Sequence, residues 1–295
     1  MMGVQSSGNP VACPICGQRM TYSGDADYYD QSSRYRTPVY HCGSCDVLYR
    51  PLDHRRLVSH YYAATYVQDK NEENLLRSRI GFFRWILSLV RRYGFTEGAG
   101  GPRPSVLVDF GSAYGHLLRL AEEQGYRAVG IELNEDLVKS CREKGLVVLR
   151  GFEEFSEKVD VITALDSLYC VADPRELMAK IRDRLRPDGV FVARLTNRNL
   201  YAKFRSIFVR KGDWSAIGDA TVSYSMKGIR RLLALSGFRI EKVIPDCGRG
   251  KKLAARKRLS YLSTYLLTLL TLQTRILTPG IIVIARPAGG PSNNA

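Results

Sequence analysis

A glycine-rich loop between two apolar segments is the first stretch of this chain that could do chemistry. The loop reads D-F-G-S-A-Y-G from Asp109 to Gly115, and it follows the apolar run 106–108. Small side chains in a tight turn let backbone N–H groups approach a ligand, and the N-terminus of the following helix adds partial positive charge. A second apolar run, 128–131, ends at Glu132, an acid suited to the two hydroxyls of a ribose. This order predicts a site for a nucleotide-like cofactor.

The spacing of the small residues separates two classes of cofactor. Dinucleotide sites are typified by G-x-G-x-x-G, but counting from Gly111 the third glycine falls on His116. Gly111, Ala113 and Gly115 instead form D-x-G-x-A-x-G, which resembles the first motif of class I S-adenosylmethionine (SAM)-dependent methyltransferases with Ala113 in place of the middle glycine. The resemblance implies that this loop holds the methionine part of SAM and that Glu132 binds its ribose.

Four cysteines near the N-terminus have the spacing of a metal site. Cys13 and Cys16 lie in C-P-I-C-G, and Cys42 and Cys45 lie in C-G-S-C-D, 25 residues further on. Two such pairs are typical of a zinc ribbon, in which four thiolates complete a closed tetrahedral shell. A closed shell leaves no position for water, so we expect structural Zn²⁺ here. A redox-active C-x-x-C pair is the competing interpretation, although the thioredoxin-like unit that usually carries it is missing.

The segment after the second cysteine pair extends the resemblance. It reads Y-H-C-G-S-C-D-V-L-Y-R-P-L and then L-V-S-H-Y-Y-A-A-T-Y, which is similar to a bacterial methyltransferase family with an N-terminal zinc ribbon. That family includes enzymes acting on sugars, polysaccharide precursors and natural products. The resemblance implies that tyrosines of this segment reach the cofactor or substrate, and Tyr61, Tyr62 and Tyr66 are the matching candidates. Packing between domains is the alternative role.

The alternation of strands and helices predicts an α/β fold with parallel strand pairing. Together with the resemblance it implies a Rossmann-like, seven-stranded sheet whose last strand is antiparallel, joined to a small zinc ribbon. We expect the zinc ribbon over 1–58, a connecting helix and linker over 59–100, and the SAM-binding domain over 101–288.

The catalytic half of the site is less clearly marked. V-D-V-I-T-A-L-D-S-L-Y-C-V-A-D-P resembles the family's fourth-strand motif, and Asp166 matches its acid. Tyr169 and Cys170 stand where relatives often carry Glu and His, so no histidine base is assigned. We expect Asp166 to border the cofactor near the reacting centre. Further cofactor-binding candidates are Leu133, Phe152, which can cover the adenine, and Glu153.

An insertion over 197–225 mixes aromatic and basic residues and is expected to form a lid at the carboxyl ends of the strands, where α/β sheets bind ligands. Such a mixture suits an acceptor that carries phosphate, although an ordinary lid with a solvated basic face has the same composition. Tyr169, Tyr201 and Tyr224 are weak candidates for a general base.

A basic run precedes an apolar, Ser/Thr-containing segment, for which we expect an amphipathic helix over 253–277. The uncharged part, 259–274, is too short and polar for a membrane span. Residues 249–277 can make a peripheral contact with an anionic membrane, which would suit a lipid-linked acceptor. Alternatively, the helix packs on the domain or lines the substrate pocket.

Composition bounds the possible partners and functions. The chain has 295 residues, with 44 Lys and Arg against 29 Asp and Glu, a net charge of +15. Such a charge favours an anionic partner. The N-terminal residues lack a signal-peptide pattern, so we expect a cytoplasmic protein whose cysteines are thiols or metal ligands. The leading hypothesis is SAM-dependent methylation of a sugar, polysaccharide precursor or related metabolite. The alternatives are an RNA methyltransferase and a non-catalytic zinc-ribbon protein with a vestigial methyltransferase fold.

Overall fold

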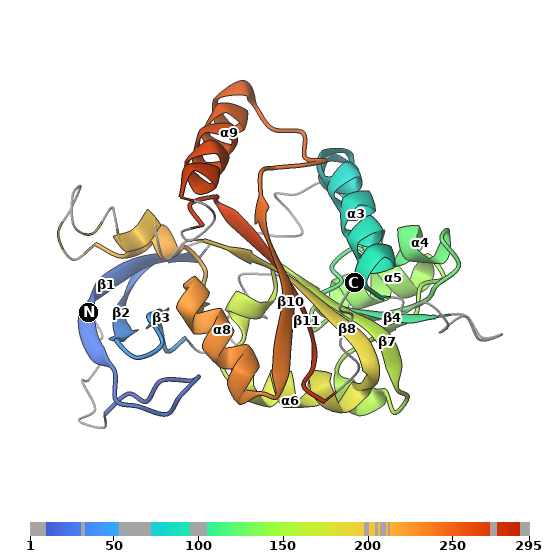
Figure 1. Ribbon diagram of the computed structural model, residues 1–295, viewed down its shortest axis with the longest axis horizontal. Coiled ribbons are helices and arrows are strands. Elements are labelled where there is room, and N and C mark those ends of the chain that lie inside the picture. Colours follow the sequence, from blue (N-terminus) through green and yellow to red (C-terminus); the bar gives the residue numbers. More distant parts are fainter. Residues whose placement is uncertain are drawn as a thin grey trace.

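The computed structural model describes residues 10–30, 33–52, 72–94, 105–197, 201–203, 206, 211, 213–271 and 276–289. Its centre is a seven-stranded sheet of order β10-β11-β8-β7-β4-β5-β6 (Figure 1). Strand β11 runs antiparallel to both of its neighbours, and the other pairs are parallel. The expected Rossmann-like sheet with an antiparallel last strand is therefore confirmed. Its strands are β4 (Val106–Phe110), β5 (Arg127–Ile131), β6 (Val148–Leu149), β7 (Val159–Leu165), β8 (Leu185–Thr196), β10 (Phe238–Asp246) and β11 (Gly280–Pro287).

Helices cover both faces of this sheet, as its nearly continuous apolar strands require. Helices α3 (Glu72–Gly94), α4 (His116–Glu122) and α5 (Glu135–Glu143) contribute to the buried cluster on one face. Helices α6 (Pro174–Arg184) and α8 (Met226–Leu235) contribute to the cluster on the other. Helix α9 (Ala255–Leu270) stands away from the sheet at the top of Figure 1. Short 3₁₀ turns occur at Phe152–Glu154, Leu168–Cys170 and Ser215–Ile217.

Local sequence explains where several helices begin. Asn134 caps α5, because its side chain accepts a hydrogen bond from the backbone N–H of Leu137. Asp173 caps α6 in the same way through the N–H of Glu176, and Pro174 occupies the first turn, where its missing N–H costs nothing. These caps set the strand-to-helix connections at the carboxyl edge of the sheet, where α/β proteins bind ligands.

A second, four-stranded antiparallel sheet carries the cysteine pairs, in the order β1-β2-β3-β9. Strands β1 (Thr21–Asp30), β2 (Ser33–Cys42) and β3 (Val47–Tyr49) come from the N-terminal part of the chain. Strand β9 (Val222–Ser223) comes from the insertion between β8 and α8. Cys45 and Val47 share one buried cluster with residues of α6 and α8, so the cysteine-bearing sheet is packed onto the main domain.

Within the described part of the chain, none of the helices combines the length and the apolar character needed to cross a bilayer.

Candidate functional site

The glycine loop between β4 and α4 has a backbone that accommodates few side chains. Gly111, Ala113 and Gly115 all have positive φ angles, of 79°, 48° and 72°. A Cβ atom on Gly111 would lie 2.6 Å from the Cβ of Ser167, and one on Gly115 would lie 2.3 Å from the Cδ1 of Leu146. Both positions therefore require glycine, whereas the third accepts alanine at the cost of a left-handed conformation.

Glu132 lies at the end of β5 and is fixed against this loop. One of its carboxylate oxygens accepts a hydrogen bond from the backbone N–H of Ala113 at 2.9 Å. The other accepts from the N–H groups of Leu133 at 2.9 Å and Asn134 at 3.0 Å. Two carboxylate oxygens offer about four acceptor sites, so the group can still accept from a ligand hydroxyl. The structure thus brings together the loop and the acid that the sequence paired.

Asp109, the first residue of the motif, is buried beneath the loop. The hydroxyl of Thr163 donates to its carboxylate at 2.6 Å, and only 4% of the residue is exposed. Burial raises the pKa of Asp109 to about 7; the Thr163 hydrogen bond opposes this shift and the charge of Glu132 adds to it. Asp109 therefore supports the loop from below, and its proton depends on pH near neutrality.

This buried carboxyl gives the folded state a testable pH dependence. Between the ordinary value of 3.8 and about 7, the folded chain binds a proton at Asp109 that the unfolded chain has lost. The contribution of Asp109 to the free energy of unfolding is therefore fully present below pH 4 and is lost as the pH rises through 7. The loss in the free energy of unfolding amounts to at most about 4 kcal/mol. We expect Asp109→Asn to unfold at higher urea concentration than the parent at pH 8, with a smaller difference at pH 5.

The exposed Asp136→Asn in the first turn of α5 serves as the matched control, because it changes the same group without a buried environment. An Asp109→Asn difference that is equal at pH 5 and pH 8 would contradict the expected titration.

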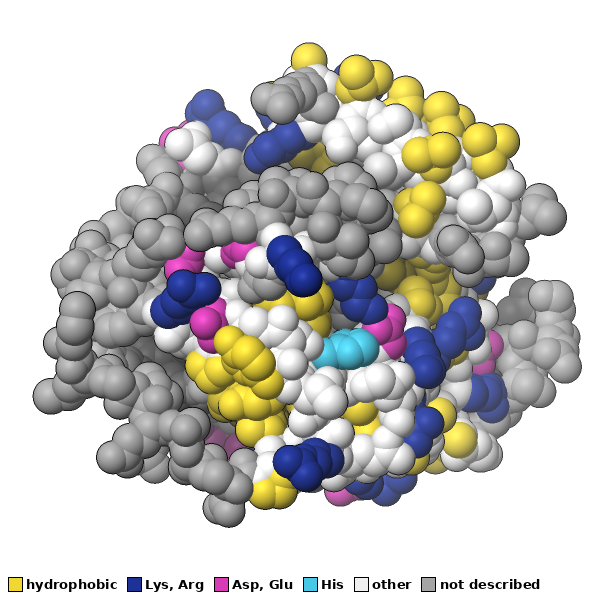
Figure 2. Space-filling view, turned by 90° about the vertical axis from the view of Figure 1, so that its left-hand side faces the viewer, with side chains coloured by type: hydrophobic (Ala, Val, Ile, Leu, Met, Phe, Trp, Pro, Cys, Tyr) yellow, Lys and Arg dark blue, Asp and Glu magenta, His cyan; other side chains and the backbone are white. Residues whose placement is uncertain are grey.

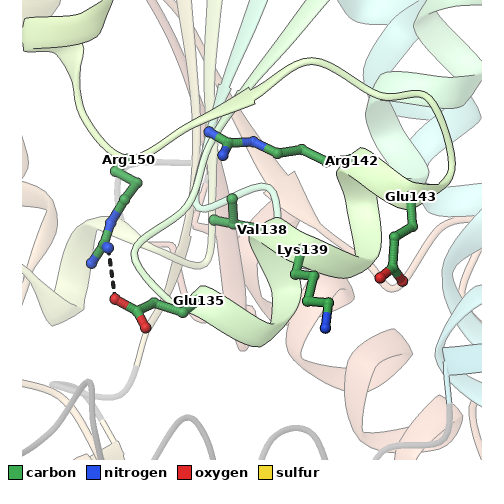
Figure 3. A pocket seen from close by; sticks show the side chains of 6 residues that line it. All are labelled: Glu135, Val138, Lys139, Arg142, Glu143 and Arg150. Atoms are coloured by element: carbon green, nitrogen blue, oxygen red, sulfur yellow. Dashed lines mark hydrogen bonds and ion pairs between the residues drawn. The ribbon is translucent and has the colours of Figure 1, made fainter.

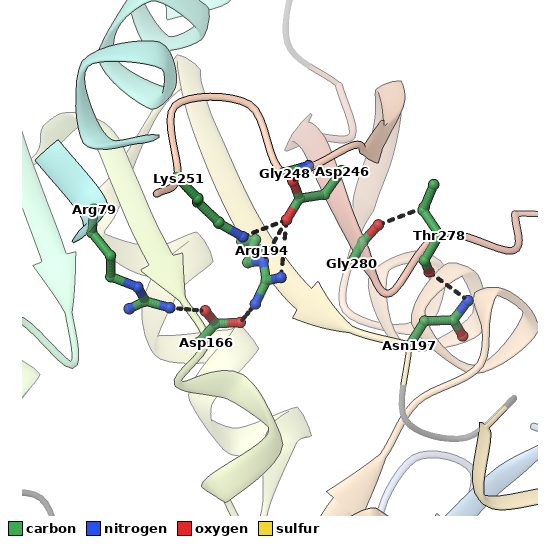
Figure 4. Close-up of polar contacts among 9 residues, drawn as sticks. All are labelled: Arg79, Asp166, Arg194, Asn197, Asp246, Gly248, Lys251, Thr278 and Gly280. Atoms are coloured by element: carbon green, nitrogen blue, oxygen red, sulfur yellow. Dashed lines mark hydrogen bonds and ion pairs between the residues drawn. The ribbon is translucent and has the colours of Figure 1, made fainter. Parts of the chain in front are cut away.

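Asp166 follows β7 and lies in a network of buried and partly buried charges (Figure 4). Its carboxylate accepts from Arg79 of α3 at 2.8 Å and forms a second ion pair with Arg194 of β8. Although burial favours the neutral acid, the charges of Arg194 and Arg79 outweigh it and lower the pKa of Asp166. The backbone of Asp166 also has a positive φ, 63°. Asp166 is therefore an ionised carboxylate fixed by two guanidinium groups.

The same network continues to the end of β10. Arg194 donates to Asp246 at 2.9 Å and 3.1 Å, and Lys251 approaches the same carboxylate oxygen to 2.7 Å. The side chain of Asp246 is fully buried, and that of Arg194 is 5% exposed. Sequence reasoning did not include Arg79, Arg194, Asp246 or Lys251 among the site residues. An arginine within the apolar run V-F-V-A-R-L was the one available signal, because a buried strand rarely carries an unpaired charge.

The tyrosines named as candidate bases lie in three different environments. Tyr224 is buried in the core, with its hydroxyl 3.5 Å from the carbonyl oxygen of Leu168, and burial strongly raises its pKa. Tyr169 is partly buried against the same core cluster. Tyr201 is 59% exposed. Tyr224 is therefore placed as a core residue, and Tyr169 packs against the cluster that contains it.

The remaining cofactor candidates also differ in position. Leu133, beside Glu132, is 48% exposed. Phe152 is buried and its ring stacks on Phe110, with the centroids 6.1 Å apart. Glu153 points to solvent and pairs with Lys180 at 2.5 Å. Tyr66, with Tyr61 and Tyr62, lies outside the described residues.

The insertion packs against the cysteine-bearing sheet where it is described. The backbone N–H of Trp214 donates to the carbonyl oxygen of Asp25 at 3.1 Å, and its indole N–H donates to that of Ser23 at 2.8 Å. Trp214 and Ile217 share a small buried cluster with Leu48. Together with β9, these contacts join the N-terminal sheet to the insertion that follows β8.

The four cysteines form one cluster, as their spacing predicts. All four sulfur atoms lie within 4.8 Å of one another, and those of Cys16 and Cys42 are 3.7 Å apart. In a tetrahedral site with Zn–S bonds of about 2.3 Å, the sulfurs are about 3.8 Å apart. Each pair also ends in the same turn, because Gly17 and Asp46 both have positive φ and donate their N–H to the carbonyls of Cys13 and Cys42. The cluster fits a structural zinc ion.

A separate pocket lies along α5 (Figure 3). It includes no residue of the glycine loop and does not include Glu132. Its edge carries an ion pair of 2.6 Å between Arg150 and Glu135. Its lining residues are Glu135, Val138, Lys139, Arg142, Glu143 and Arg150.

Comparisons with known proteins agree with this arrangement. A family model described as a methyltransferase domain matches residues 82–243. A ubiquinone biosynthesis O-methyltransferase of Methylococcus capsulatus is 31% identical over 113 residues, which cover 34% of this chain and 47% of that protein. The chain therefore matches about half the length of this curated relative.

Solved structures resemble the fold at low sequence identity. Magnesium protoporphyrin IX methyltransferase from Synechocystis PCC 6803, solved with bound S-adenosylhomocysteine (SAH), has a TM-score of 0.50 and 16% identity, covering 80% of this chain and all of that chain. A SAM-dependent methyltransferase from Clostridium acetobutylicum has a TM-score of 0.47 and 13% identity, covering 78% and 97%. Because the family model spans more than half of the 295 residues, the chain belongs to the methyltransferase-domain family, within the class I SAM-dependent methyltransferases.

Proposed function

We propose that this chain transfers the methyl group of SAM to a small-molecule acceptor. The observation that carries the proposal is the fixed arrangement of the glycine loop and Glu132. Three backbone N–H groups orient the Glu132 carboxylate, and the loop beside it has no room for a side chain at Gly111 or Gly115. SAM supplies an electrophilic methyl on a sulfonium; the acceptor atom forms the new bond to carbon, and SAH leaves with the electron pair. Such a displacement depends mainly on alignment and exclusion of water.

In this proposal Glu132 binds the ribose and the exposed Leu133 offers an apolar surface to the adenine. Asp166 positions groups near the reacting centre, because a carboxylate between two guanidinium groups is a poor proton acceptor. An acceptor that needs deprotonation must therefore find its base elsewhere, and the partly buried Tyr169 and the exposed Tyr201 are the remaining candidates among the tyrosines assigned from the sequence.

Calorimetry with SAM tests the cofactor site. A carboxylate–hydroxyl hydrogen bond contributes about 1.5–3 kcal/mol, so Glu132→Ala should weaken SAM binding by about 10- to 100-fold. Gly111→Ala should abolish detectable binding, because the added methyl would lie 2.6 Å from Ser167. The exposed acid Glu135, three residues beyond Glu132, is the control, and Glu135→Ala should leave the affinity unchanged. Equal affinities for the parent and Glu132→Ala would show that the site is misplaced.

We further propose that the acceptor is a sugar, a polysaccharide precursor or a related metabolite carrying phosphate. The support is the net charge of +15 and the zinc-ribbon resemblance of the N-terminal segment. Incubation with methyl-labelled SAM separates this proposal from the RNA alternative. One acceptor panel contains sugars linked to nucleotides or to lipid phosphates, and the other contains total RNA. Label in the sugar panel is the expected result, and label confined to RNA would contradict it.

We also propose that Cys13, Cys16, Cys42 and Cys45 hold a structural Zn²⁺. Burial raises the pKa of Cys13 to about 11, although hydrogen bonds from the backbone of Cys16 and Ile15 oppose the shift. Without a cation this thiol is protonated, and a bound dication would stabilise the thiolate instead. The ion would link two turns that are far apart in the sequence.

A further inference from the structure

Helix α9 turns its leucines away from the protein. Leu259, Leu262, Leu266 and Leu270 are 68%, 52%, 51% and 78% exposed. Their spacing of three, four and four residues places them along one side of the helix. In Figure 2, hydrophobic side chains gather at the top of the molecule, where α9 lies in Figure 1. An unbroken apolar stripe of this kind marks a contact with something other than water.

The inner side of α9 is the more polar one. Thr268 is fully buried, and its hydroxyl accepts a hydrogen bond from the N–H of Leu277 at 2.9 Å. Tyr261, seven residues earlier and therefore on the same side, packs against Gly248, where a Cβ would lie 3.1 Å from its ring. A helix that only served the core would present its leucines inward. The orientation of α9 is the reverse of that arrangement.

Basic side chains surround the start of this helix. Lys257 and Arg258 are exposed in the first turn of α9, and Lys252 is exposed in the loop before it. Asp246 is the last acidic residue of the sequence, so the 49 residues that follow it carry no negative side chain. The surface formed by α9 and the loop before it is therefore apolar and positively charged at once.

The loop that leads to α9 is anchored, so this surface has a defined orientation. The backbone N–H of Lys252 donates to the carbonyl oxygen of Ser78 in α3 at 3.1 Å. Gly250 contacts the backbone of Gly81 so closely that a Cβ on Gly81 would lie 2.6 Å from the Gly250 carbonyl oxygen. The guanidinium of Arg249 lies 5.7 Å from the centre of the Trp85 ring.

We propose that α9 and the basic loop before it dock on an anionic phospholipid surface, with the leucine stripe in the interface and the Lys and Arg side chains on the headgroups. A 16-residue helix is about 24 Å long and can lie flat in the interface. A second copy of the chain is the competing occupant, but it brings the same positive charge to the contact, whereas an anionic bilayer complements it.

Docking in this way would face the carboxyl edge of the sheet towards the membrane. Asp246, the last residue of β10, pairs with Gly280, which also pairs with Thr196, the last residue of β8. Helix α9 therefore leaves the sheet at the edge that carries the glycine loop, so a lipid-borne acceptor would arrive on the side of the proposed methyl-transfer site.

Vesicle flotation of the full chain tests the proposal. Phosphatidylcholine vesicles with and without 30% phosphatidylglycerol are the probes. We expect binding to the anionic vesicles, weakened by 0.5 M salt, and little binding to the neutral ones. Lys252→Gln, Lys257→Gln and Arg258→Gln should each lower the affinity about fivefold, and Leu262→Ser with Leu266→Ser should lower it at least tenfold.

Exposed residues elsewhere provide matched controls. Leu235→Ser in α8, where the leucine is 46% exposed, and Lys139→Gln in α5 should bind vesicles like the parent. Thermal unfolding checks that the α9 variants are folded. Their affinity for SAM in calorimetry, which does not involve lipid, should equal that of the parent. The membrane proposal and the methyl-transfer proposal can therefore fail separately. The proposal would be overturned if the parent did not bind the anionic vesicles. A parent that is a dimer in light scattering, that becomes a monomer with Leu262→Ser and Leu266→Ser, and that does not bind vesicles would show that a second copy is the occupant.

Discussion

Replacing Arg194 by methionine is expected to lower the free energy of unfolding by about 3 kcal/mol. The guanidinium joins Asp166, whose side chain is 12% exposed, to Asp246, whose side chain is fully buried. Methionine fills similar space but leaves Asp246 with Lys251 and Asp166 with Arg79. Because each acid keeps one cation, the expected loss lies at the lower end of the range for a broken buried ion pair. Urea unfolding at pH 7 measures it.

An exposed ion pair supplies the comparison. Arg127, at the start of β5, pairs with Glu157, and their side chains are 43% and 57% exposed. Water and salt screen such a pair, so Arg127→Met should change the free energy by at most about 1 kcal/mol. Equal losses for Arg194→Met and Arg127→Met would mean that the buried network contributes no more than a surface pair.

The Arg194 variant should also reach the proposed active site. Asp166 has a positive φ and directly precedes Ser167, whose hydroxyl donates to the carbonyl oxygen of Phe110 at 2.7 Å. Loss of the Arg194 contact would release one side of a backbone that is held close to Gly111. We therefore expect weaker SAM binding in Arg194→Met and normal binding in Arg127→Met.

Removal of the metal or of a cysteine ligand is expected to destabilise the whole chain. Apparent binding energies of structural Zn²⁺ are about 10–16 kcal/mol, which is as large as the total stability of about 5–15 kcal/mol typical of a domain. The effect should not stay local. Val47, next to the second cysteine pair, packs so tightly on α8 that a Cβ on Gly228 would lie 2.3 Å from its Cγ1 atom. Cys45→Ser or a strong chelator should therefore lower the melting temperature of the main transition.

Metal analysis and thermal unfolding check this prediction together. The parent should contain one zinc per chain, and Cys45→Ser should contain much less. Cys247 lies outside the cluster, so Cys247→Ser should keep both the metal and the melting temperature. A metal-free parent whose melting temperature ignores the chelator would contradict the zinc proposal.

The glycine loop and its contact with Glu132 were predictable from the sequence because the requirements on these residues are local. Gly111 and Gly115 are required by backbone angles within a single turn, and Glu132 follows at the end of the adjacent parallel strand. The cysteine pairs are local in the same sense, since each pair shares one tight turn. The alternation of elements predicted parallel pairing, and the family resemblance implied seven strands with an antiparallel last strand; the order of the strands came from the structure.

The charged network around Asp166 was not predictable from the sequence, because its other members come from four separate elements. Arg79 belongs to α3, Arg194 to β8, and Asp246 with Lys251 to the end of β10 and the loop after it. The spacing of these four residues along the chain does not indicate that their side chains are in contact. Tyr224 was named as a candidate base because it lies in an insertion rich in polar and basic residues. Its side chain is instead buried in the core.

The sequence by itself determined the class of fold, the pairing of the glycine loop with Glu132 and the grouping of the four cysteines, because short-range backbone geometry and the period of apolar residues carry that information. The tertiary structure decided how Asp166 is held and which side of α9 meets water. The first depends on contacts between segments more than 50 residues apart, such as Arg79 with Asp166 and Arg194 with Asp246. The second depends on the packing of Tyr261 against Gly248 and of Thr268 against Leu277. The pattern of leucines alone predicts an amphipathic helix, but the partner of its apolar face is set by the elements against which the other face packs.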